Sequence, residues 1–68
     1  MSTRSESREM LFKRDLERRA ERGKTSLAEK YKELDIISAI ATSMTLLGER
    51  ELAEYAINQW EALLAHKF

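Results

Sequence analysis

The thirteen residues Ile36–Gly48, IISAIATSMTLLG, are the longest stretch of this 68-residue chain without a charged side chain. A membrane-spanning helix needs about 20 apolar residues, whereas a shorter run is typical of a buried helix. The apolar side chains recur at helical spacing, at Ile37, Ile40, Met44 and Leu47. We therefore predict that this run forms the second half of a helix and lies at the centre of the fold.

Helix start and stop signals on either side of this run divide the chain into three predicted helices. Ser26 and Glu29 form a capping box, in which the serine hydroxyl accepts from the Glu29 amide and the carboxylate reaches back to the Ser26 amide. Gly23 and Gly48 suit positions just beyond a helix end, where a left-handed backbone favours glycine. The predicted helices span about 5–22, 27–47 and 50–66.

The composition agrees with an all-α fold. The chain has no Pro, two Gly and no Cys, and 35% of its residues are charged. Ala, Leu, Glu, Lys and Arg are abundant, and all of them favour helices. The absence of Cys and of a long apolar run gives the expectation of a cytoplasmic protein that does not enter a membrane.

Charge divides the chain into two parts, although the formal net charge is zero. Residues 1–24 carry a net charge of +3 and few apolar side chains, whereas residues 25–68 carry −3 and most of the Leu, Ile and Ala. We therefore predict a single domain with a charged N-terminal helix or arm over 1–24 and a helical hairpin over 25–68. The hairpin is expected to form the oligomerisation core.

The predicted second helix is apolar on more sides than one short neighbour can cover. A chain below roughly 70–80 residues also rarely gains more than about 3–5 kcal/mol from its own core. Both points predict a homo-oligomer, with a dimer favoured, in a helical bundle. The alternative is a single-chain bundle in which the first helix folds back over the second. The expected oligomer core consists of Ile36, Ile37, Ile40, Met44, Leu47 and Trp60.

Six arginines of the first helix fall within about 140° of its circumference. An arginine stripe suits an acidic protein surface or a phosphate backbone, although it is also found on purely solvated faces. A pI of 6.6 is low for a dedicated nucleic-acid binder. Tyr55, flanked by Glu51 and Glu54, is expected to point away from the core as an anchor for a partner. The predicted partner-binding residues are Arg4, Arg8, Arg14, Arg18, Arg19, Arg22 and Tyr55.

Residues for catalysis are sparse. The chain has one histidine, His66, and no cysteine. The sequence therefore does not provide the combinations of residues that nucleophilic catalysis, metal binding and nucleotide binding require. We therefore expect no enzymatic activity, no metal and no cofactor. The leading hypothesis is a small homo-oligomeric helical protein that binds another protein as an adaptor, inhibitor or regulator. The alternative is a nucleic-acid-binding regulator that uses the arginine stripe of the first helix.

Overall fold

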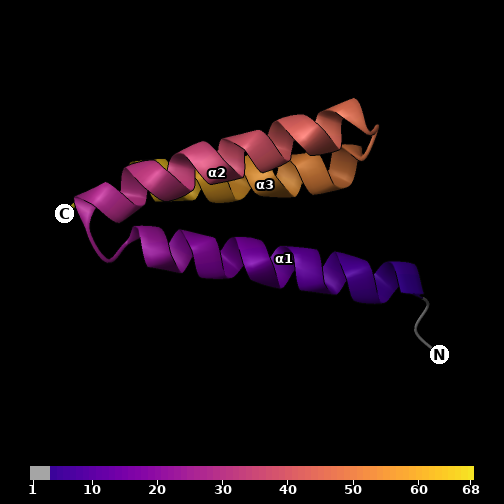
Figure 1. Cartoon of the computed structure of the whole chain (residues 1–68), viewed down its shortest axis with the longest axis horizontal. Coiled ribbons are helices and arrows are strands. Elements are labelled where there is room, and N and C mark those ends of the chain that lie inside the picture. The colour runs from indigo at the N-terminus through magenta and orange to yellow at the C-terminus, as the bar shows by residue number, and fades with distance from the viewer. Residues whose placement is uncertain (1–3) are drawn as a thin grey trace.

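The computed structural model describes residues 4–68, and from Ser7 onward it also describes the side chains. This part of the chain forms three helices, α1 (Arg4–Gly23), α2 (Leu27–Leu46) and α3 (Arg50–Ala65) (Figure 1). The predicted all-α fold is confirmed, and each observed helix end lies within one residue of its predicted position. None of the three helices is long and apolar enough to cross a membrane.

The ends of α2 follow the expected chemistry. The Glu29 amide donates to the Ser26 hydroxyl over 3.2 Å, so the first of the two capping-box bonds is present. Gly48, just after α2, has a φ of +79°, which a side chain would strain. The chain therefore reverses sharply there, and α3 returns along α2 as the predicted hairpin.

Gly23 differs from the expectation that it would terminate α1 in a left-handed conformation. It is the last residue of α1, it is buried, and the positive-φ glycine of the described chain is Gly48. A Cβ at Gly23 would lie 2.6 Å from Cδ2 of Leu63 in α3. The glycine is therefore required for the close approach of α1 to α3.

The core lies between all three helices. Figure 1 shows α1 running alongside the α2–α3 hairpin, and α1 contacts both of its helices. Leu16 of α1 is fully buried together with Ile37 of α2 and Leu63 of α3. This is the arrangement of the single-chain bundle, which was the alternative to coverage of α2 by a second copy. Dimerisation itself remains a prediction.

Candidate functional site

The arginine stripe of α1 is divided between the interior and the solvent. Arg8, Arg14 and Arg18 are exposed, whereas Arg19 is half-buried against α2. Arg22 is exposed, but its guanidinium group also faces α2. The side chain of Arg4 lies outside the described residues. The prediction of one continuous binding stripe is therefore wrong for Arg19, because this side chain is used to hold the fold together.

The residue that draws these arginines inward is Glu33 of α2. Its side chain is fully buried, with Oε1 3.4 Å from Nη1 of Arg19 and Oε2 3.9 Å from Nη1 of Arg22. Arg19 also donates from Nε to Oδ2 of Asp15 over 3.0 Å, and this hydrogen bond is the main cause that raises the pKa of Arg19. Positive charge from α1 thus neutralises a carboxylate that would otherwise be costly to bury.

The sequence analysis did not single out Glu33, although a signal is present. Glu33 precedes Ile37 by four residues and Ile40 by seven, so it lies on the apolar stripe of α2. A charged residue on such a stripe indicates a buried ion pair. Oε2 of Glu33 is buried and accepts no hydrogen bond from the described residues. The buried Glu33 carboxylate is therefore only partly hydrogen-bonded.

The side chain of Tyr55 points in a different direction from the one predicted. Its ring is half-buried and packs against the core, and its hydroxyl donates to Oε1 of Glu17 over 2.6 Å. Nζ of Lys13 lies 5.4 Å from the ring centroid. The hydrogen bond to Glu17 is the main cause that raises the pKa of Tyr55. The expectation that Tyr55 points away from the core is wrong, because α1 packs on that side of α3.

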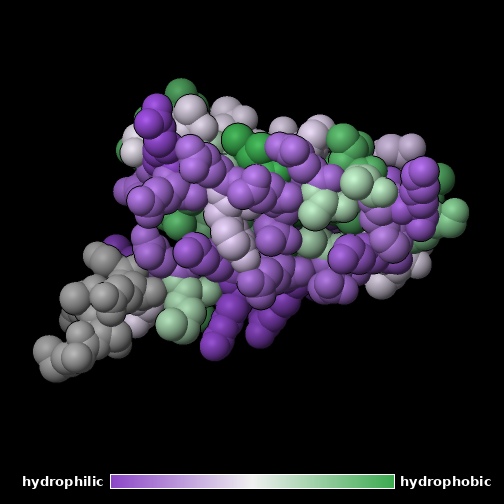
Figure 2. All heavy atoms as spheres, turned by 180° about the vertical axis from the view of Figure 1, so that it is seen from behind, coloured by the Kyte–Doolittle hydropathy of each residue, from purple (hydrophilic) through white to green (hydrophobic). Residues whose placement is uncertain are grey.

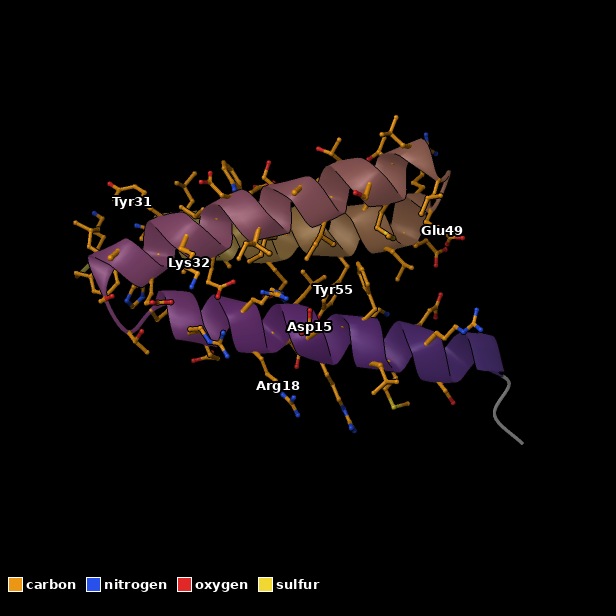
Figure 3. All side chains as sticks on the ribbon, in the orientation of Figure 1. Asp15, Arg18, Tyr31, Lys32, Glu49 and Tyr55 are labelled. Atoms are coloured by element: carbon orange, nitrogen blue, oxygen red, sulfur yellow. The ribbon has the colours of Figure 1, made fainter. Side chains whose placement is uncertain are left out.

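The outer face of α1 is the part of the stripe that remains open to solvent. We define it by Met10, Leu11, Arg14 and Arg18. Met10 and Leu11 are 55% and 64% exposed. Arg14 and Arg18 are one helical turn apart, and neither forms an ion pair within the part of the chain that the structure describes. Figure 3 shows Arg18 directed away from the other two helices.

The residues of the predicted oligomer core are buried to different extents within one chain. Ile37 is fully buried in the core of its own chain, so the prediction that it contacts a second copy is wrong. Ile36, Ile40 and Met44 are half-buried and border a shallow groove that Phe12 of α1 closes on one side. The other two members are Trp60, which is half-buried, and Leu47, which is 70% exposed.

A second apolar surface lies between α2 and α3. A cavity of about 400 Å³ opens there, and Leu46 at its edge is 83% exposed. Figure 2 views the molecule from behind, and most of the exposed hydrophobic groups in this view lie in its upper half, away from α1. We call this cavity the α2–α3 groove. It is lined by Ser38, Ala41, Thr42, Thr45, Leu46, Ile57 and Trp60.

Groups suited to metal chemistry are not assembled in residues 7–68, whose side chains the structure describes. No three His, Cys, Asp or Glu side chains of this region lie close enough together to hold a metal ion. His66 ends α3 as its C-cap residue. Comparison of the chain with protein-family models, with curated proteins and with solved structures finds no match. The candidate sites therefore follow from the geometry, which offers two exposed surfaces.

Proposed function

We propose that this protein is a non-enzymatic helical interaction module, an adaptor, inhibitor or regulator, that binds an acidic protein through the outer face of α1. The observation that carries the proposal is the exposure of Arg14 and Arg18 beside two large apolar side chains. Leu11 and Met10 together present the apolar part of this face. Two further arginines of the same helix, Arg19 and Arg22, instead pair with Glu33 of α2.

The chemistry of this face suits a protein partner. Arg14 and Arg18 are spaced so that two carboxylates on one partner helix can meet them together. Exposed ion pairs alone contribute only about 0–1 kcal/mol each. Apolar side chains beside the arginines supply the desolvated contact area on which interface affinity depends, so Met10 and Leu11 favour a partner that combines acidic with apolar residues.

A nucleic-acid partner is the second candidate, because the same arginines can contact phosphates. Two observations favour a protein. The first is the pI of 6.6, which is low for a dedicated nucleic-acid binder. The exposed apolar pair of the outer face also has no counterpart on a phosphate backbone.

Site-specific photo-crosslinking tests the proposal. A photoreactive amino acid replaces Leu11 on the outer face of α1, and in a matched control it replaces exposed Asn58 on α3. Irradiation in the source cell is expected to give a crosslinked protein from position 11 that is absent from position 58. A product that nuclease removes would favour the nucleic-acid alternative. Equal products from both positions, or none from position 11, would contradict the proposal.

A further inference from the structure

We infer that buried Glu33 regulates the binding face of α1, because it competes with the acidic partner for Arg22. Oε2 of Glu33 is buried and accepts no hydrogen bond from the described residues, and Nη1 of Arg22 lies 3.9 Å from it. That distance is too long for a hydrogen bond, so the two groups are joined by charge alone. The inference rests on the proposed function, in which the outer face of α1 binds an acidic protein.

The two arginines beside Glu33 are held to different degrees. Arg19 donates to Oδ2 of Asp15 over 3.0 Å and to Oε1 of Glu33 over 3.4 Å, and its side chain is 30% exposed. The side chain of Arg22 is 63% exposed, and the 3.9 Å contact is its one ion pair among the described side chains. Arg22 can therefore rotate away from Glu33 while Arg19 stays in place.

Rotation of Arg22 would extend the outer face of α1. Arg22 follows Arg18 by four residues and Arg14 by eight, so successive side chains start only about 40° apart around the helix. All three arginines are exposed. A partner helix with carboxylates at the same four-residue spacing can meet all of them, and each contact is then a charge-assisted hydrogen bond.

The third contact is made at the expense of Glu33. When Arg22 turns toward the partner, its distance from Oε2 increases and the buried carboxylate keeps only Arg19 beside it. Reduced pairing of a buried charge is unfavourable, so this cost is subtracted from the affinity for the partner. The coupling is reciprocal, because a bound partner also weakens the ion pair between α1 and α2. Glu33 therefore holds the affinity of the outer face below the value that three free arginines would give.

Fluorescence anisotropy with a labelled peptide tests the inference. The probe is a helical peptide with three glutamates at four-residue spacing and leucines beside them. Glu33→Gln frees Arg22 and should bind the probe about threefold to fivefold more tightly than wild type, or about 0.7–1 kcal/mol. Asp35→Asn is the matched control, since it removes an exposed negative charge from the same helix, and it should change the affinity less than about twofold.

A double-mutant cycle shows whether the effect passes through Arg22. In an Arg22→Gln background, Glu33→Gln should leave the affinity unchanged, with equal helicity by circular dichroism. An equal gain in that background, or no gain in the wild-type background, would overturn the inference. If the probe fails to bind wild type, or binds equally well after Arg14→Glu with Arg18→Glu, the proposed function is wrong and the inference fails with it.

Nuclear magnetic resonance of the unmutated protein provides an independent readout. Saturation with the probe should shift the guanidinium signal of Arg22, because this group changes partner, and should shift that of Arg19 much less. A signal of Arg22 that does not move while the probe is bound would show that its contact with Glu33 is purely structural, and this would contradict the inference.

Discussion

Removal of Arg19 should cost far more stability than removal of its buried partner. Arg19→Ala leaves the carboxylate of Glu33 buried, with Nη1 of Arg22 still 3.9 Å from Oε2. Loss of one partner from a buried ion pair costs about 3–5 kcal/mol. Because the side chain of Arg19 is 30% exposed and Arg22 remains, we expect about 2–3 kcal/mol. This is a large share of the stability that a chain of this size commonly gains from its core.

The reverse change should be mild. Glu33→Gln keeps the shape of the side chain and removes the buried charge, and Oε2 of Glu33 accepts no hydrogen bond that would be lost. Arg19 keeps its bond to Asp15, 3.0 Å long. We therefore expect a cost of about 1 kcal/mol or less. Arg18→Ala is the matched control, since this neighbouring arginine is exposed, and its effect should stay within about 0.5 kcal/mol.

Urea unfolding followed by circular dichroism measures all three variants. A small domain loses about 1 kcal/mol of stability per molar urea, so Arg19→Ala should lower the midpoint by about 2 M relative to Arg18→Ala. Equal midpoints for these two variants would show that the buried pair does not hold α1 to α2. A larger loss for Glu33→Gln than for Arg19→Ala would refute the reasoning on the same grounds.

Two further predictions concern the packing of α1 against α3. Gly23→Ala should destabilise the fold by about 1–2 kcal/mol in urea unfolding, because the added Cβ meets fully buried Leu63. This cost should exceed the preference of about 1 kcal/mol that alanine has over glycine in a helix. A stabilised variant would contradict this prediction. Tyr55→Phe should cost about 0.5–1.5 kcal/mol at neutral pH through loss of the bond to Glu17. The pKa of Tyr55 is raised in the folded state, so the stability that this hydrogen bond contributes is present below about pH 10 and is lost as the pH rises through the folded-state pKa. The unfolding curves of the wild type and of Tyr55→Phe should therefore converge at alkaline pH. Curves that stay equally separated at all pH values would argue against this bond.

The helices could be predicted from the sequence because their signals are local. The capping serine and Gly48 mark the ends of α2 and the hairpin turn, and the structure shows both in these roles. The course of α1 could not be predicted in the same way, since it depends on contacts distant in sequence. Gly23 meets Leu63 in the core, and the Tyr55 hydroxyl meets Glu17 at the surface between α1 and α3. Each of these contacts is visible only when three helices are placed together.

The candidate site was predictable in part. The arginine stripe follows from helical spacing, and Arg14 and Arg18 are exposed as expected. Which arginines turn inward depends on the buried Glu33, because a carboxylate removed from solvent attracts the nearest cations of the facing helix. The exposed apolar groove of the hairpin was missed for a related reason. Once α1 covers one side of α2, the opposite side is left open.

The central claim is that α1 divides its arginines, with the inner ones holding the fold and the outer ones binding an acidic partner. The most direct test is the affinity of the crosslinked partner for a variant with Arg14→Glu and Arg18→Glu. A variant with Glu51→Lys and Glu54→Lys on exposed positions of α3 is the matched control. The account predicts that the arginine reversal abolishes binding with helicity unchanged, while the control binds normally. Normal binding by the arginine variant, or loss of binding in the control alone, would contradict it.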